Sequence, residues 1–418
     1  MIGGDGMRTR LETLYTPNKD IHIYEGLLMV VGNHGAGKTE FLNSVINKEY
    51  RIISDKKYRI VPLLLTNTFV TLTTILNEVL GDEENWTESY PAYIRKHYSK
   101  KEAESILSRI PNAVDLLPNV VNELFVVKRL IIIEMLLCIS DKMAIVIDEP
   151  ELAGHPMIVR DICIALRQLQ EKGNIVIVAT NSETVVSKLF EDIEQLVRLE
   201  KKTGIIQVDI KKLENEILTF FKKDIYLLRQ FSNSKYLDKG LNNVLMNYTR
   251  VYLSSIFRNT MFNLLHADGV ILGEGSSEDV LFDYLDLVIH PEWMRDYRIQ
   301  YMGCLGKNTM PFYFLFLNHL GIKTVCLYDA DKNTNPVHAS YAKAFAEYEK
   351  ENSHLYAKMA LNPDLEHVLD IVPNYKLLSI EKPVNIYHNT FATDNIKDKV
   401  SKLSDVIKAL FDKMEKEE

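Results

Sequence analysis

Residues 27–39 read LLMVVGNHGAGKT, a run of five apolar residues followed by a glycine-rich loop that ends in Lys38 and Thr39. The loop fits the G-x-x-x-x-G-K-[ST] pattern, which binds nucleotide phosphates where it joins a strand to a helix. Its glycines let backbone N–H groups turn toward the β-phosphate, and the following helix adds its positive N-terminal end. We therefore expect a nucleotide-binding α/β domain built around this strand.

The loop assigns a role to each functional residue. Lys38 is expected to offset charge on the β- and γ-phosphates of ATP, and the Thr39 hydroxyl to hold Mg²⁺. The residues expected to surround the nucleotide are Gly32, Asn33, Gly35, Gly37, Lys38 and Thr39.

An acidic pair ends a second apolar run, in the segment AIVIDEPEL at residues 144–152. We expect Asp148 to bind the magnesium ion through water and Glu149 to polarise the water that attacks the γ-phosphate. Such a pair at a strand end is otherwise often a solubilising loop. Next to a phosphate loop, it indicates ATP hydrolysis.

The segment IDEPEL, followed by AGHP at residues 153–156, resembles the ABC-type ATPases of the OLD (overcoming lysogenisation defect), Rad50 and SMC group. The resemblance implies ATP bound between two ATPase heads, and hence a homo-oligomer. Two departures matter. Residues 117–123 lack the Ser-Gly pair of a signature loop, and Asn181 stands where these ATPases usually carry histidine. Asn181 can hydrogen-bond a phosphate or water but cannot take up a proton, which argues against fast turnover.

Acidic residues also follow two strands in the second half of the chain. Glu274 and Glu278 follow the run 269–273, and Asp329 and Asp331 follow the run 323–328. The carboxyl ends of parallel strands form one crevice, where four carboxylates would repel each other unless Mg²⁺ or Mn²⁺ ions lie between them. Two such ions serve in-line attack on a phosphodiester. Taken alone, the EGSSE segment is also an ordinary acidic first turn of a helix.

This E-G-x-S-E segment, followed by D-x-D, resembles the Toprim domain of topoisomerases, primases and OLD-family nucleases. The resemblance implies Glu274 as metal-linked base, with Glu278, Asp329 and Asp331 as further metal ligands. It also implies Glu366, in the segment DLE, as a ligand, and Lys382, in the segment EKP, as a lysine that steadies the transition-state charge. The last two residues fit simple surface positions equally well.

Composition limits the alternatives. With 418 residues, two or three domains are expected, and 49 Lys and Arg against 57 Asp and Glu give a formal net charge of -8. This acidic balance argues against a protein that coats nucleic acid over its whole surface, although a local basic patch fits. Four scattered cysteines fit neither a zinc site nor a disulfide framework, and no apolar run is free enough of charge to span a membrane. We expect a cytoplasmic protein.

Apolar runs alternate with helical patterns in both halves, which predicts α/β folds with largely parallel sheets. We expect an ABC-type P-loop ATPase domain at 1–205, a helical connector at 206–262 and a C-terminal Toprim (Rossmann-like) domain at 263–418. Residues 211–260 hold nine basic and four acidic side chains, so the connector has either a functional basic face or only a solvated one. The expected strands are at 27–31, 60–65, 144–147, 175–179, 269–273, 298–304 and 323–328, and the expected helices at 86–110, 118–139, 276–288, 309–320, 339–351 and 397–418.

The order of ATPase and Toprim is that of OLD proteins, which are related to the Gabija and PARIS phage-defence proteins. The interpretation is an ATP-regulated, metal-dependent nuclease, with DNA favoured over RNA as its nucleic-acid partner. The resemblance alone implies a role in antiphage defence and a second defence protein as partner. Two alternatives stay open: an ATP-dependent sensor or scaffold whose Toprim domain is inactive or partner-dependent, and an enzyme that polymerises or rejoins nucleic acid.

Overall fold

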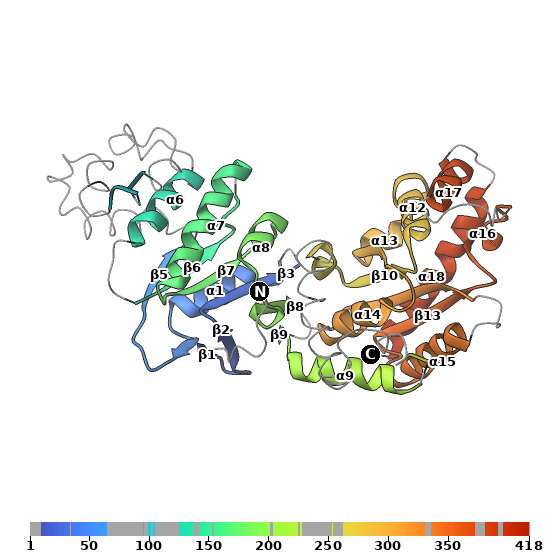
Figure 1. The fold of residues 1–418 in the computed structure, drawn as a ribbon, viewed down its shortest axis with the longest axis horizontal. Coiled ribbons are helices and arrows are strands. Elements are labelled where there is room, and N and C mark those ends of the chain that lie inside the picture. Colours follow the sequence, from blue (N-terminus) through green and yellow to red (C-terminus); the bar gives the residue numbers. More distant parts are fainter. Residues whose placement is uncertain are drawn as a thin grey trace. The chain divides into compact units, whose positions relative to one another are not determined.

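The structure is a computed structural model of the chain. It describes residues 10–33, 35–64, 99–101, 103–104, 125–137, 142–152, 154–200, 204–224, 226–227, 262–330, 336–372, 381–391 and 396–417, together with Arg95 and Leu253. The chain divides into two compact units, residues 1–207 and 208–418. Each unit is built around its own sheet (Figure 1).

The first unit contains a nine-stranded mixed sheet. Its parallel part has the order β8-β3-β7-β6-β5, so that β7 lies between β3 and β6. Antiparallel strands β2, β1 and β4 extend it from β3, and β9 extends it from β8. The strands are β1 Leu11–Tyr15, β2 Ile21–Tyr24, β3 Leu27–Gly32, β4 Arg51–Ile53, β5 Arg59–Leu63, β6 Met143–Asp148, β7 Ile175–Ala179, β8 Leu196–Glu200 and β9 Gly204–Gln207.

Helices cover this sheet because its central strands are buried along their whole length. Helix α1 (Lys38–Ile46) packs Phe41 and Val45 against Leu28 and Val30 of β3 in one apolar cluster. Helix α7 (Pro156–Glu171) contacts β7, and helices α6 (Phe125–Leu136) and α8 (Glu183–Leu189) pack against α7. The start of α1 and the carboxyl ends of β3, β6 and β7 therefore meet at one edge of the sheet.

The second unit contains a four-stranded parallel sheet of order β11-β10-β12-β13. The chain passes from β10 to β11 on one side and then to β12 on the other, which makes β10 the topological switch point. The strands are β10 Gly269–Gly273, β11 Ile299–Gly303, β12 Lys323–Asp329 and β13 Tyr356–Leu361. The helices are α9 Ile210–Lys222, α12 Ser276–Tyr284, α13 Glu292–Asp296, α14 Met310–His319, α15 Pro336–Glu351, α16 Leu365–Val368, α17 Lys382–Phe391 and α18 Lys397–Glu417.

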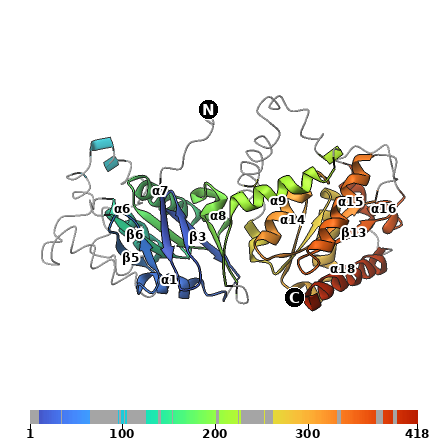
Figure 2. The ribbon, with the colours of Figure 1, turned by 90° about the horizontal axis from the view of Figure 1, so that it is seen from below.

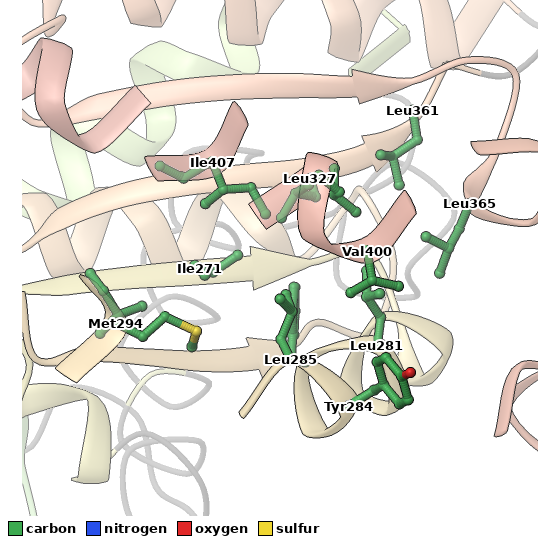
Figure 3. Packing of buried hydrophobic residues seen from close by; sticks show 14 of the residues in the cluster. Ile271, Leu281, Tyr284, Leu285, Met294, Leu327, Leu361, Leu365, Val400 and Ile407 are labelled. Atoms are coloured by element: carbon green, nitrogen blue, oxygen red, sulfur yellow. The ribbon is translucent and has the colours of Figure 1, made fainter. Parts of the chain in front are cut away.

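Helices flank this sheet on both sides (Figure 2). On one side, Ile271 of β10 and Leu327 of β12 face Val400 and Ile407 of α18 (Figure 3). On the other side the core is aromatic, and the Phe314 ring of α14 lies 4.6 Å from the Tyr356 ring, between centroids. Burial on both faces explains why the central strands β10 and β12 are mostly apolar without alternation.

All seven expected strands are present, with ends within two residues of the expected ones. The expectation of largely parallel sheets holds for the second unit. The first sheet gains four short strands that pair only antiparallel, β1, β2, β4 and β9, and strand β8, which pairs parallel with β3 and antiparallel with β9. Strand β13 and helix α17 were also not expected. Most of the expected helix at 86–110, the signature-loop region at 117–123 and most of the connector after residue 227 lie outside the described residues. None of the described helices is both long and apolar enough to cross a membrane.

Candidate functional site

The phosphate loop leaves β3 in a conformation that requires glycine. Gly32, Gly35 and Gly37 have φ angles of 145°, 74° and 93°, and a Cβ atom on Gly32 would collide with the carbonyl oxygen of Leu199. Gly37 caps α1, so the N-terminal N–H groups of that helix point into the loop. Of the other loop residues, Asn33 is buried and His34 lies outside the described residues.

The Lys38 side chain reaches back to the backbone of the phosphate loop. Its Nζ donates to the carbonyl oxygens of Gly32, at 2.8 Å, and Asn33, at 3.3 Å. Burial lowers the pKa of Lys38, while the nearby charges of Glu149, Asp148 and Glu151 raise it. Backbone oxygens of the loop thus hold the ammonium group, and a phosphate, as a charged acceptor, would bind it more strongly than they do.

Thr39 and Asp148, 109 residues apart in sequence, are in contact. The Thr39 hydroxyl donates to Asp148 Oδ2 at 2.8 Å, and Asp148 is only 4% exposed. A hydroxyl and a carboxylate side by side at the end of the phosphate loop are the ligand pair that a P-loop ATPase offers to Mg²⁺. The donor chemistry therefore fits a magnesium ion at this position.

Glu149 has an unusual backbone conformation and a specific partner. Its φ angle is 43°, and its Oε1 accepts a hydrogen bond of 3.1 Å from Asn181 Nδ2, at the end of β7. Asn181 is in turn held by Glu151, whose Oε1 accepts from the Asn181 N–H at 3.1 Å and from the Thr180 hydroxyl at 2.9 Å. The amide of Asn181 therefore orients the glutamate expected to polarise water.

Arg129, in α6, was not expected at this site. Its guanidinium is fully buried and donates to the carbonyl oxygens of Glu149, at 2.5 Å, and Leu63, at 3.1 Å. Burial lowers its pKa to about 10, opposed by the charges of Asp148, Glu151 and Glu149. Arg129 thus stays charged at neutral pH and braces the backbone turn that carries Glu149. Arg129 follows Lys128 in a mostly apolar helix, and this sequence has no pattern that would reveal the contact.

In the second unit, three of the expected carboxylates meet at the carboxyl edge of the parallel sheet. Glu274 follows β10, Asp329 ends β12, and Glu278 lies in the first turn of α12. Glu274 Oε2 accepts a hydrogen bond of 3.1 Å from the Asp329 N–H, and Glu278 Oε2 accepts one of 2.8 Å from the Gly275 N–H. A Cβ atom on Gly273 would collide with the Glu278 side chain, so glycine is needed there for this approach.

Burial and mutual repulsion raise the pKa values of two of these carboxyl groups, Glu278 and Asp329. Burial, followed by the charge of Asp329, raises the pKa of Glu278 to about 8. Burial, followed by the charges of Glu274 and Glu366, raises the pKa of Asp329 to about 7, against the opposing charge of Lys307. Such raised pKa values indicate a buried site whose carboxylates are not fully neutralised by nearby positive charges.

Lys307 is a buried cation next to these carboxylates and was not expected. It is 5% exposed, and its Nζ lies 3.4 Å from Glu274 Oε2, 3.1 Å from His338 Nδ1 and 5.8 Å from the centroid of the Tyr328 ring. It therefore fixes the Glu274 carboxylate from the side of the protein interior. It stands in the segment GKN that follows β11, where a lysine gives no signal of its own.

The remaining expected residues of this site lie around the same cavity, with one exception. Glu274, Glu278 and Asp329 line a cavity of ≈ 570 Å³ together with Glu366 and Lys382. Asp331 lies outside the described residues. The geometry thus brings Glu366 and Lys382 to the carboxylates, positions that their sequence context left open.

Residues 265–331 match the model of a protein family described as overcoming lysogenization defect protein-like, Toprim domain. The second unit contains an OLD-like Toprim domain. No curated protein matches the chain. Among solved structures, the chain is similar to a nucleotide-free ATP-binding cassette from an ABC transporter, with 17% identity over 49% of this chain and 94% of that one and a TM-score of 0.31. It is also similar to a dimeric ATP-binding cassette bound to ADP and Pi, with 17% identity over 47% and 95% and a TM-score of 0.30.

The expected α/β folds are confirmed in both units, and the family match confirms the expected Toprim domain. In the first unit, the phosphate loop and the Thr39–Asp148 contact lie at the carboxyl ends of the parallel strands, where open α/β sheets bind their ligands. In the second unit, the three carboxylates lie within or next to the matched Toprim segment.

The Toprim donor set fits a hard divalent cation, because it consists of carboxylate oxygens. Within the described part of the chain, no group of three or more His, Cys, Asp or Glu side chains is already arranged to hold a metal ion. The carboxylates accept hydrogen bonds from backbone N–H groups, including that from Leu365 to Asp329 Oδ1 at 3.1 Å. Because a carboxylate has two oxygens and about four lone-pair sites, these groups can bind a cation and keep their N–H donors.

Proposed function

We propose that this protein is an ATP-regulated, divalent-metal-dependent nuclease that cleaves nucleic-acid phosphodiesters and acts in the cytoplasm in defence against phage. The observation that carries the proposal is the convergence of Glu274, Glu278 and Asp329 at the switch point of an OLD-like Toprim sheet. The raised pKa values of Glu278 and Asp329 support the proposal, because they indicate carboxylates that the unit itself does not fully neutralise.

Each residue of the Toprim site has a distinct part in the proposed reaction. Glu278 and Asp329 would hold Mg²⁺ or Mn²⁺, with Glu366 and Asp331 as further ligands. Glu274 would hold an ion and accept the proton of the attacking water. Bound divalent ions supply the positive charge that polarises the phosphate. Lys382, at the cavity wall, would stabilise the charge that develops on the phosphate oxygens.

The ATPase unit has the residues for binding and hydrolysis, and we assign it the regulatory role. Lys38, Thr39 and Asp148 would hold ATP and Mg²⁺, while Glu149, oriented by Asn181, would polarise water. Asn181 cannot store a proton, so turnover would be slow and the ATP-bound state long-lived. A long-lived ATP state suits a switch that pairs two ATPase heads in a homo-oligomer.

A cleavage assay tests this function. Plasmid, linear DNA and tRNA are incubated with Mg²⁺ or Mn²⁺, with and without ATP, and the products are separated on a gel. We expect cleavage of a nucleic acid that requires the divalent ion and changes in rate with ATP. No cleavage of any substrate, while ATP still binds, would favour the sensor or scaffold function over the nuclease.

A further inference from the structure

A basic groove lies on the first unit, along the chain segment that leads from α1 through β4 to β5. It consists of two hollows, of ≈ 640 and ≈ 710 Å³, that share Lys48, Lys57, Tyr58 and Ile60. Among the described residues, the ionisable side chains other than tyrosine that line it are six cations and one carboxylate, namely Lys48, Arg51, Lys56, Lys57, Arg59, Lys142 and Asp55. On a chain with a formal net charge of -8, this groove concentrates positive charge.

The cations at the groove are available to a ligand. Lys48, Arg51, Lys56 and Lys57 are exposed, and none of them forms an ion pair within the described residues. Four unpaired cations close together repel each other, a cost that a bound polyanion relieves. The arrangement is therefore suited to binding several negative charges at once.

Two tyrosines give the groove fixed aromatic surfaces. The Tyr58 hydroxyl donates to Glu12 Oε1 at 2.9 Å and accepts from Arg10 at 3.2 Å, which holds its ring in place. The Tyr50 ring packs edge-on against Phe41 of α1, with centroids 5.4 Å apart. Rows of cations interleaved with held aromatic rings are a pattern of surfaces that bind the sugar-phosphate backbone and stack on bases.

The groove lies away from the ATP site of the same unit. Arg59 and Lys142 stand at the amino ends of β5 and β6, where the Arg59 N–H donates to the Lys142 carbonyl at 2.9 Å. The phosphate loop lies at the carboxyl ends of the parallel strands, at the start of α1, and Lys48 lies just beyond the end of that helix, about 13 Å away along its axis. A ligand in the groove therefore leaves the nucleotide position free.

We propose that the basic groove binds the phosphate backbone of the nucleic acid on which the Toprim site acts. The inference rests on the proposed nuclease function for its choice of polyanion, because a nuclease needs a surface that holds its substrate beyond the cleaved bond. An acidic protein is the competing partner for such a surface. The aromatic rings favour nucleic acid, since they offer stacking that an acidic peptide does not use.

The test is binding of a fluorescein-labelled 30-base-pair DNA and of a 30-nucleotide single strand, by anisotropy at several salt concentrations without divalent ions. The variant is Lys56→Glu/Lys57→Glu in the full chain. The matched control, Lys402→Glu/Lys416→Glu, makes the same charge change at exposed positions of α18. ATP binding by each variant reports that the first unit is folded and that the groove is separate from the nucleotide site.

We expect the groove variant to bind about tenfold more weakly at low salt and to lower the slope of log affinity against log salt by about two, because each lost phosphate contact removes about one counterion. The control should bind as the wild type does, and ATP should not displace DNA. Unchanged affinity and slope in the groove variant would overturn the proposal. So would binding of poly-glutamate, but not of nucleic acid, through these lysines.

The outcomes separate this inference from the nuclease function. Intact cleavage of saturating DNA by the wild type, together with unchanged binding by the groove variant, would reject the groove and keep the nuclease. Weakened binding by the groove variant, in a protein that cleaves nothing, would keep the groove and reject the nuclease.

Discussion

Metal binding at the Toprim site should depend steeply on pH. A divalent ion needs Glu278 and Asp329 ionised, yet their pKa values are raised to about 8 and about 7. Each bound ion should therefore release two protons below pH 7 and about one between pH 7 and 8. The apparent affinity for Mn²⁺ should rise about 10²- to 10³-fold from pH 6 to pH 8.

The same shifts fix the sign of the effect on stability without metal. The ordinary values are 4.5 for Glu278 and 3.8 for Asp329, so the folded protein binds more protons than the unfolded chain above those values. The contribution of these two groups to the free energy of unfolding should then be fully present below about pH 4 and be lost as pH rises toward 8. Added Mg²⁺ should restore stability most strongly at the alkaline end, where fewer protons compete.

Calorimetric titration with Mn²⁺, in buffers of different ionisation enthalpy, measures the affinity and the number of released protons together. The Glu278→Gln variant should release about one proton fewer and bind more weakly at pH 8, whereas Asp405→Asn, at an exposed position of α18, should behave as the wild type. Equal affinity at pH 6 and pH 8 with no proton release would refute the assignment of these carboxylates as metal ligands.

Three further predictions concern the ATPase unit. Lys38→Ala should lose ATP binding, while Glu149→Gln should bind ATP and stop hydrolysis; equal ATP affinity of Lys38→Ala and wild type, measured with a fluorescent nucleotide, would contradict the phosphate-loop assignment. Arg129→Met leaves the carbonyl oxygens of Glu149 and Leu63 without their buried donor and should lower the free energy of unfolding by about 2 to 5 kcal/mol in urea titrations. The exposed control Arg160→Met should change that free energy by less than about 0.5 kcal/mol. With ATP and Mg²⁺, light scattering at micromolar concentration should show an oligomer built from paired heads, and a monomer alone would argue against such pairing.

The sequence predicted the parts of the site that follow strand ends. Asp148, Glu274 and Asp329 each stand directly after an apolar run, and Lys38 ends the glycine-rich loop that follows another. Parallel strands bring their carboxyl ends to one edge of each sheet. The contact between Thr39 and Asp148 thus follows from motif and topology together. The phosphate loop and the acidic pair could be assigned to one site without predicting the helices between them.

The parts that the sequence did not predict depend on tertiary packing. The partners of Arg129 and Lys307 are backbone or side-chain oxygens that lie far away in the sequence. The local spacing of residues therefore does not predict these contacts. Short strands such as β2 and β4 have four and three residues, too few for an alternating pattern to appear. Their pairing is decided by the sheet that they extend.

The most direct test of the central claim is cleavage by Glu274→Gln and Asp329→Asn, compared with Lys38→Ala, on one DNA substrate with Mg²⁺ or Mn²⁺. Both carboxylate variants should lose cleavage by orders of magnitude and keep DNA binding, because they lose metal-held chemistry and not the binding surface. Lys38→Ala should keep a functional Toprim site and change only the response of cleavage to ATP. Full cleavage by both carboxylate variants would contradict the claim that this site cuts nucleic acid.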